Sequence, residues 1–207
     1  MVKDYLHVTD ELLDIGTGGG ERIIEFAPFA RRLLGVDPDP VMIAHAQELA
    51  AESGVTNVTF SVGTECDIGA KFDVVVNRHA PFDVDVLRAC LRPGGYFVTQ
   101  QVGERNMTSI KIAFGANLGV PPPISKEVFS RQGLVVERFN HYDVPYVVED
   151  IESLIFWLQS LDVAHSDFGG FAAQRDTAAI NRLLATSLTP RGVVTNEHRY
   201  LLIARAL

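Results

Sequence analysis

Two features of the sequence, a glycine-rich turn and a carboxylate that follows it, have the residue types and spacing needed to bind a nucleoside. The turn reads DIGTGGG over residues 14–20, between a short apolar run and a helical pattern. Glycines let ligand atoms approach the backbone closely. Asp37 ends the next apolar run, about twenty residues after the turn begins, where a carboxylate can accept both hydroxyls of a ribose. The alternative is a tight turn beside an exposed aspartate.

The charges around the turn favour a cationic ligand over a diphosphate. Glu21 stands at the last position of the dinucleotide-binding pattern, where glycine or alanine is usual. A carboxylate in the first turn of a helix also repels a diphosphate bound there. Glu21 and Asp14 suit a ligand that carries a sulfonium and an amino group.

Further polar residues follow the predicted strands that carry them. His79 lies just past the fourth strand, where an imidazole can act as a general base, and Arg78 could orient an anionic substrate. The alternative for both is a structural role in joining loops. Gln100 and Gln101 end the fifth strand, and because side chains alternate along a strand, one of them is expected to point into the cleft. Either glutamine could hydrogen-bond the substrate, and the alternative is that it satisfies loop backbone groups.

Short apolar runs alternate with helical patterns, which predicts a parallel sheet with helices on both faces. Strands are expected at 12–15, 33–36, 58–62, 72–76, 96–100, 134–139 and 200–206. Helices are expected at 21–33, 41–53, 82–91, 108–118, 126–131, 151–161 and 174–188, and Pro28 could kink or shorten the first of them. About nine residues join the third and fourth strands, so this link is expected to be an extended loop rather than a helix.

Four motifs in order resemble the class I S-adenosylmethionine-dependent methyltransferases over roughly residues 11–105. They are LDIGTGGG at 13–20, GVDP at 35–38, FDVV at 72–75 and LRPGGYF at 91–97. Asn-Arg-His at 77–79 and TQQVG at 99–103 are similar to a little-characterised bacterial subgroup. The resemblance implies an α/β, Rossmann-like sheet of seven mostly parallel strands, ordered 3-2-1-4-5-7-6, with only the seventh antiparallel.

The resemblance also implies S-adenosylmethionine as cofactor and a role for each motif residue. The methionine part would lie against Asp14, Gly16, Thr17, Gly18, Gly20 and Asn77. Asp37 would hold the ribose, with Pro38 and Met42 beside the adenine.

The sequence departs from the family pattern at two places. Thr64 stands where many relatives have an aspartate that contacts the adenine, and the candidates to substitute for it are Glu65, Cys66 or a backbone group. Only about ten residues precede Glu11, where relatives have helices that cover the site. Three explanations stay open: the start is set too late in the gene, the site is unusually open, or another chain, such as the second copy in a homodimer, covers it.

Composition limits the classes of partner. The formal net charge is −8, and the only adjacent basic pair is Arg31-Arg32, so nucleic acid is not expected as a partner. The two cysteines do not have metal-type spacing, and no pattern of a catalytic metal site is present, so no metal is expected. The low cysteine content and the lack of a long apolar segment indicate a soluble, cytoplasmic protein that does not bind a membrane.

The whole chain, 1–207, is expected to be one methyltransferase domain with a cofactor-binding half at 11–105 and a substrate half at 106–207. A small helical cap is expected around 149–190, where Trp157 either packs or covers an aromatic substrate. The predicted activity is methyl transfer to an oxygen or nitrogen of a small molecule. The alternatives are a cofactor-binding protein without transferase activity and, less favoured, a nucleotide-dependent oxidoreductase.

Overall fold

The computed structural model describes residues 2–64, 67–122, 124–160 and 171–207. Their contacts divide the chain into two compact units. Unit 1 comprises Met1–Gln101, Pro123–Asn140 and Leu201–Leu207, and unit 2 comprises Val102–Pro122 and His141–Tyr200. Unit 1 therefore contains segments from beyond residue 105, because the last strands of the chain return to its sheet. Whether the chain acts as one domain stays a prediction.

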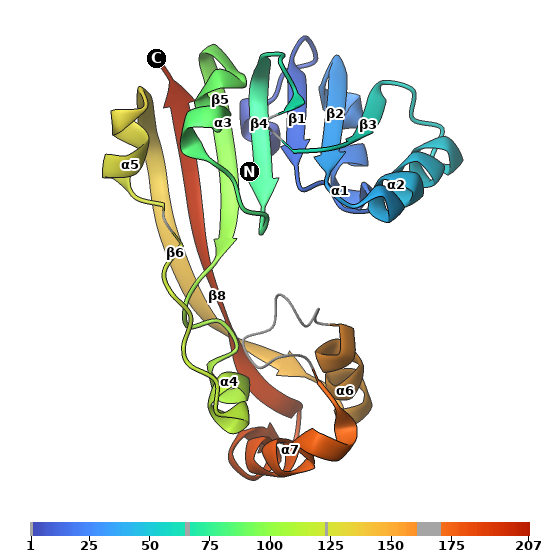
Figure 1. Cartoon of the computed structure of the whole chain (residues 1–207), viewed down its shortest axis with the longest axis vertical. Helices are drawn as coiled ribbons and strands as arrows, with labels where there is room; N and C mark the ends of the chain where they lie inside the picture. The colour runs from blue at the N-terminus through green and yellow to red at the C-terminus, as the bar shows by residue number, and fades with distance from the viewer. Residues whose placement is uncertain (1, 65–66, 123, 161–170) are drawn as a thin grey trace. The chain divides into compact units, whose positions relative to one another are not determined.

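The sheet has the strand order β3-β2-β1-β4-β5-β8-β6, with β7 paired to β8 (Figure 1). Its strands are β1 (Glu11–Ile15), β2 (Arg32–Asp37), β3 (Val58–Val62), β4 (Phe72–Arg78), β5 (Leu91–Val102), β6 (Leu134–Val148), β7 (Leu188–Thr189) and β8 (Gly192–Ala206). The pairs from β3 to β5 are parallel, and the arrow of β8 runs opposite to that of β5. The predicted fold class and order are confirmed, with β8 in the place of the expected seventh strand.

The helices of unit 1 follow the predicted pattern except after the glycine turn. They are a 3-10 turn at Val2–Tyr5, α1 (Glu21–Ile24), a 3-10 turn at Ala27–Phe29, α2 (Pro40–Glu52), α3 (Val84–Ala89) and α5 (Lys126–Arg131). The helix expected over 21–33 is shortened to α1 and a separate 3-10 turn, as the position of Pro28 indicated. Pro28 lies at the start of the 3-10 turn, and because proline has no backbone N–H and its ring clashes with the preceding helical turn, α1 cannot continue through it. In the described residues between β3 and β4 there is no α-helix, as predicted.

The core of unit 1 is built on strands buried on both faces. All five residues of β1 are buried, as expected for a central parallel strand. On one side Leu12, Leu33 and Val74 pack with Ile23 and Phe26. Burial of these side chains fixes the positions of the strand ends, where the polar residues lie.

The described residues of unit 2 form three helices, β7 and parts of β6 and β8. The helices are α4 (Thr108–Phe114), α6 (Ile151–Ser160) and α7 (Ala173–Ser187). Ile110, Leu154, Leu158 and Leu183 are fully buried in one cluster, so α6 packs its apolar face inward. None of the helices in the described part of the chain has both the length and the apolar character of a membrane span.

Candidate active site

Three glycines of the turn after β1 have left-handed backbone conformations. The φ angles are +71° at Gly16, +56° at Gly18 and +84° at Gly20. A Cβ atom on Gly16 would lie 2.4 Å from the Cβ of Ala80, so only glycine fits there. The backbone N–H groups of Gly16 and Thr17 both donate to the carbonyl of Val36, at 2.9 and 3.0 Å. The turn is therefore tied to the end of β2.

Asp37, at the end of β2, is hydrogen-bonded to the glycine turn itself. Its Oδ2 accepts from the backbone N–H of Gly18 at 2.9 Å, and its Oδ1 accepts from Asp39 N–H at 3.0 Å. Each carboxylate oxygen keeps acceptor capacity after these bonds, and Asp37 is only half-buried. The two predicted features of a nucleoside site, 19 residues apart in the chain, thus lie in contact.

Asp14, at the end of β1, is buried and incompletely hydrogen-bonded. Its Oδ2 accepts from the Thr17 hydroxyl at 3.1 Å and from the Arg78 guanidinium at 3.4 Å. Its Oδ1 is buried and has no hydrogen-bond partner among the described residues. Burial raises the pKa of Asp14 to about 6, although Arg78 and Thr17 act in the opposite direction. A buried carboxylate oxygen without a donor is a place where a cationic or hydrogen-bond-donating ligand group would be stabilised.

Asn77, in β4, belongs to a buried amide network with β5. Its Nδ2 donates to the carbonyl of Ile15 at 3.4 Å, which links β4 to the strand that leads into the turn. Gln101 Nε2 lies 2.6 Å from Asn77 Oδ1, 2.9 Å from Thr99 Oγ1 and 3.3 Å from the carbonyl of Ala80. Of the two glutamines left open by the sequence, Gln101 is the buried one that faces this network. The network holds Ala80 against Gly16.

The two candidate catalytic residues lie next to one another with different constraints. Arg78 is ion-paired with Asp14 at 3.4 Å. His79 has a φ angle of +64°, a conformation that costs a non-glycine residue about 1–2 kcal/mol. Its backbone N–H donates to the carbonyl of Gln100 at 3.0 Å. Backbone strain of this kind is enriched at functional sites, where surrounding contacts maintain it.

The residues assigned to the adenine lie at the surface. Pro38, Met42 and Thr64 are exposed. The backbone N–H and hydroxyl of Thr64 both contact Asp67 Oδ2, at 2.9 and 3.3 Å. Glu65 lies outside the described residues.

Trp157 belongs to unit 2, where it lies beside Tyr146 with ring centroids 5.6 Å apart. It lines a small cavity of about 190 Å³. The other lining residues are Asn106, Met107, Tyr146, Asn196, Glu197 and Arg199. All of them belong to unit 2.

Sequence reasoning missed the Asp14–Arg78 pair and the contacts of Thr99 and Ala80. The strand order could have indicated the pair, because Ile15 and Asn77 face each other across the β1–β4 pairing. Among the described residues, no group of three or more histidine, cysteine or acidic side chains is arranged to hold a metal ion.

The sequence matches known methyltransferases over its first half. Residues 6–119 match a family model described as a methyltransferase domain. An uncharacterized methyltransferase, YcgJ, of Bacillus subtilis is 33% identical over 84 residues, which cover 39% of this chain and 33% of that protein. A ubiquinone biosynthesis O-methyltransferase of Methylobacterium nodulans is 35% identical over 112 residues, covering 49% of this chain and 44% of that one. The matches thus span about a third to a half of these curated relatives.

Solved structures extend the likeness to the whole fold. The crystal structure of YcgJ from Bacillus subtilis has a TM-score of 0.73 at 21% identity, covering 100% of this chain and 96% of that chain. A methyltransferase-type structure from Bacillus halodurans has a TM-score of 0.69 at 15% identity, covering 97% and 94%. At these identities the likeness shows the fold alone. Since the family model covers more than half of the residues, the chain belongs to the methyltransferase-domain family.

Proposed function

We propose that this protein transfers a methyl group from S-adenosylmethionine to an oxygen or nitrogen atom of a small molecule. The observation that carries the proposal is the hydrogen bond between Asp37 and the backbone of Gly18. It brings a half-exposed carboxylate, suited to two ribose hydroxyls, to a glycine backbone that a ligand can approach closely. Family membership supports the same cofactor.

The donor and acceptor groups around the turn fit such a cofactor. A Cβ on Gly18 would meet no atom within 4 Å, so open space lies against that part of the backbone. Asp14, with its unpartnered Oδ1, would interact favourably with a ligand amino group. When bound, the cofactor supplies an activated methyl group. The protein's part is then to orient the two reactants and exclude water.

In this proposal the residues at the end of β4 have separate tasks. Asn77 holds the β1 end and thereby positions the turn. His79 would remove a proton from an acceptor that must lose one. The guanidinium of Arg78 donates to Asp14, and its remaining N–H groups would orient an anionic acceptor.

A small-molecule acceptor is favoured by the acidity of the chain and by some of its relatives. The net charge of −8 disfavours nucleic acid. The ubiquinone biosynthesis enzymes are named for a small-molecule pathway, whereas two other relatives are named for ribosomal protein L11 and for L-isoaspartate in proteins.

Trp157 is proposed to cover an aromatic acceptor. Trp157→Ala is then expected to weaken acceptor binding and leave cofactor affinity unchanged. We place the protein in the cytoplasm, either as a monomer or as a homodimer.

Calorimetric titration with S-adenosylmethionine and S-adenosylhomocysteine tests the cofactor. We expect micromolar affinity and a loss of at least tenfold in Asp37→Asn. Asp39→Asn is the matched control, because Asp39 caps α2 through its side chain and asparagine caps equally well. Tighter binding of NAD than of either adenosyl compound, or equal affinities in the two variants, would contradict the proposal.

A second candidate function is cofactor binding without transfer. Thr64 favours it, because its polar groups are engaged by Asp67 at the place where relatives carry an adenine contact. A panel of phenols, carboxylates and amines, incubated with labelled methyl donor, separates the two functions. A methylated product supports transfer. Micromolar cofactor affinity without product from any acceptor supports the second function.

A further inference from the structure

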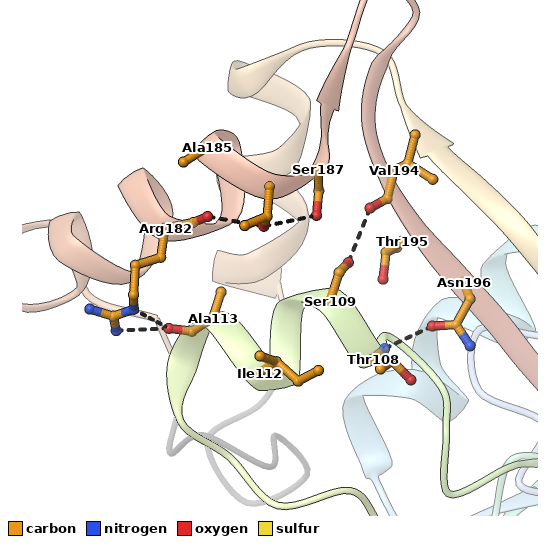
Figure 2. Close-up of a pocket in the computed structure, with 11 residues that line it drawn as sticks. Thr108, Ser109, Ile112, Ala113, Arg182, Ala185, Ser187, Val194, Thr195 and Asn196 are labelled. Carbon is orange, nitrogen blue, oxygen red and sulfur yellow. Dashed lines mark hydrogen bonds between the residues drawn. The ribbon is translucent and has the colours of Figure 1, made fainter.

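Unit 2 contains a cavity that is unconnected with the residues considered so far for the cofactor. It has a volume of about 680 Å³, within the range of about 300–1,000 Å³ that is typical of small-molecule sites. Its walls come from α4, α7 and the start of β8, and Figure 2 shows these residues around the first turns of α4. They are Thr108, Ser109, Ile112, Ala113, Arg182, Ala185, Thr186, Ser187, Val194, Thr195 and Asn196.

The cavity wall is mainly apolar and contains no carboxylate among the described residues. Ile112 is 67% exposed although it is a large apolar residue beside a concavity. A ligand that covered Ile112 would remove apolar surface from water, which is favourable. Arg182 is the only charged residue among the described residues of the wall, and its Nε and Nη2 groups donate to the carbonyl of Ala113 at 3.0 and 2.8 Å. A cationic ligand would therefore meet no opposite charge here.

Thr195 provides an unused hydrogen-bonding group in this wall. Its side chain is buried, with 5% of the residue exposed, and its Oγ1 has no hydrogen-bond partner among the described residues. The neighbouring hydroxyl of Ser109 differs, because it donates to the carbonyl of Val194 at 3.0 Å. A buried hydroxyl without a partner destabilises the protein unless a ligand supplies one.

Two polar residues of the wall contact α4 near its opposite ends. Asn196 Oδ1 accepts from the backbone N–H of Thr108 at the start of the helix, at 2.8 Å. Arg182 binds Ala113 near its end. At about 1.5 Å per residue these positions are about 7–8 Å apart along the helix axis. This length suits a chain of several carbon atoms or one aromatic ring with a substituent.

We propose that this cavity binds a small, mostly apolar molecule that carries one oxygen atom, neutral or anionic, which accepts a hydrogen bond from the Thr195 hydroxyl. The site uses none of the residues of the glycine turn, and its occupation does not depend on methyl transfer. The ligand class follows from the apolar wall, the absent carboxylate and the unpartnered hydroxyl.

The test uses 1-octanol, octanoate and octylammonium as probes of the full-length protein, with backbone amide NMR shifts as readout. We expect 1-octanol and octanoate to shift the signals of Ile112, Thr195 and Asn196. We expect octylammonium to bind at least tenfold more weakly. Equal binding of all three probes, or no binding at millimolar concentration, would overturn the proposed ligand class and site.

Two variants locate the binding and separate it from folding. Ala185→Phe fills the cavity and is expected to weaken binding of 1-octanol at least tenfold. Ala178→Phe is its control, because Ala178 is an exposed residue of the same helix outside the cavity wall. Thr195→Val removes the unused hydroxyl, so we expect a higher Tm together with at least threefold weaker binding. A lower Tm in Thr195→Val, or equal affinity in Ala185→Phe and Ala178→Phe, would contradict the assignment.

Discussion

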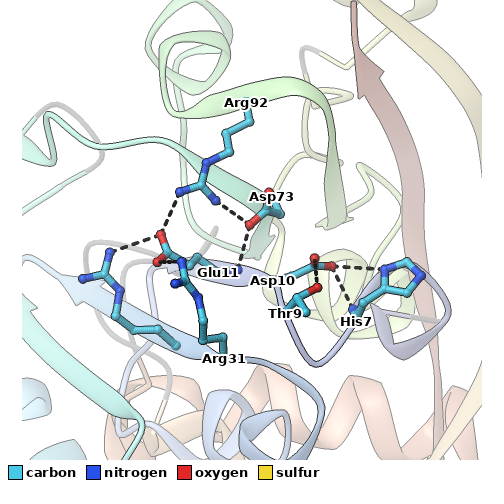
Figure 3. A network of polar contacts seen from close by, with 8 residues as sticks. His7, Thr9, Asp10, Glu11, Arg31, Asp73 and Arg92 are labelled. Carbon is cyan, nitrogen blue, oxygen red and sulfur yellow. Dashed lines mark hydrogen bonds and ion pairs between the residues drawn. The ribbon is translucent and has the colours of Figure 1, made fainter.

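The two ends of β1 carry one buried carboxylate each, and their surroundings differ sharply. Glu11, at the start, contacts three arginines, and Figure 3 shows Arg31 and Arg92 beside it. The hydrogen bond from Arg92 is the main cause that holds the pKa of Glu11 below its usual value. Asp14, at the other end, has one arginine at 3.4 Å and one oxygen without a partner, and burial raises its pKa to about 6.

This difference separates a carboxylate that stabilises the fold from one that we propose to contact a ligand. Glu11 and Asp73 share Arg92, and Asp73 Oδ2 also accepts from the backbone N–H of Glu11 at 2.8 Å, which ties β1, β4 and β5 at the ends where these strands begin. Stabilising contacts are complete there. At the opposite ends of the strands the contacts are incomplete, and in open parallel sheets ligands bind at that edge.

The largest effect is expected from Gly16→Ala, in the turn that follows the Asp14 end of β1. Its φ of +71° and the close Cβ of Ala80 predict a loss of about 3 kcal/mol in the free energy of unfolding, with loss of cofactor binding. Urea unfolding and calorimetry measure the two. Gly54→Ala is the control, because Gly54 has a φ of +66° but a Cβ there would meet no atom within 4 Å. Equal losses in both variants would refute the role of Ala80.

Asp14→Asn is expected to weaken S-adenosylmethionine binding about 30-fold, or about 2 kcal/mol, because it removes a charge that the ligand amino group needs. The same variant should unfold at an equal or higher temperature at pH 8. The ionised carboxylate, with its pKa raised from 3.8 to about 6, costs on the order of 3 kcal/mol in the folded state. A large fall in Tm at pH 8 would show that Asp14 stabilises the fold after all.

Glu11→Gln tests the end of β1 where the carboxylate is paired with arginines. This variant is expected to lower stability and leave cofactor affinity nearly unchanged. We expect a loss of about 1.5 kcal/mol in unfolding free energy, because three arginines lose their shared partner while remaining partly solvated. Cofactor affinity should stay within twofold. Glu25→Gln, in an exposed pair with Arg22, is the control, with an expected loss under about 0.5 kcal/mol. A change in affinity above tenfold in Glu11→Gln would remove the contrast between the ends.

The smallest effect is the pH dependence of cofactor affinity. Asp14 is ionised above its pKa of about 6, and the ligand amino group favours that form. Affinity should therefore be nearly constant above about pH 7 and fall about tenfold between pH 7 and pH 5. The stability of the unliganded protein changes with pH in the opposite direction. Because the pKa of Asp14 is higher in the folded state than its usual value, the contribution of Asp14 to the free energy of unfolding falls as the pH rises from about 4 to 6. Titrations of Asp14→Asn should lack the affinity change.

Much of the fold and of the cofactor-binding candidates could be predicted from short-range patterns. The turn, Asp37 and the strands up to β4 are encoded in local apolar runs and glycines. The outer strands were predicted too short, because β6 and β8 extend through polar segments. Asp143 and Pro145 in β6 resemble a loop composition, although they lie within the 134–148 strand.

Long-range side-chain contacts could not be read from the sequence. Arg78 was assigned to a substrate, while the structure pairs it with Asp14, 64 residues away. The positive φ of His79 depends on the contact of its backbone with Gln100, which only the β4–β5 register supplies. The choice between Gln100 and Gln101 needed the same register. The roles of these residues remain predictions.

Because β8 lies between β5 and β6, this part of the sheet can form only after the last strand of the chain has been synthesised. Residues 134–148 emerge from the ribosome before residues 192–206, but β6 has its place in the sheet beside β8, not beside β5. Until about sixty further residues have been made, β5 presents an unpaired edge and β6 has no neighbour. Open strand edges invite pairing with other chains. The nascent protein is therefore most exposed to misassembly late in translation, after the strands that lead to the proposed cofactor site are already complete.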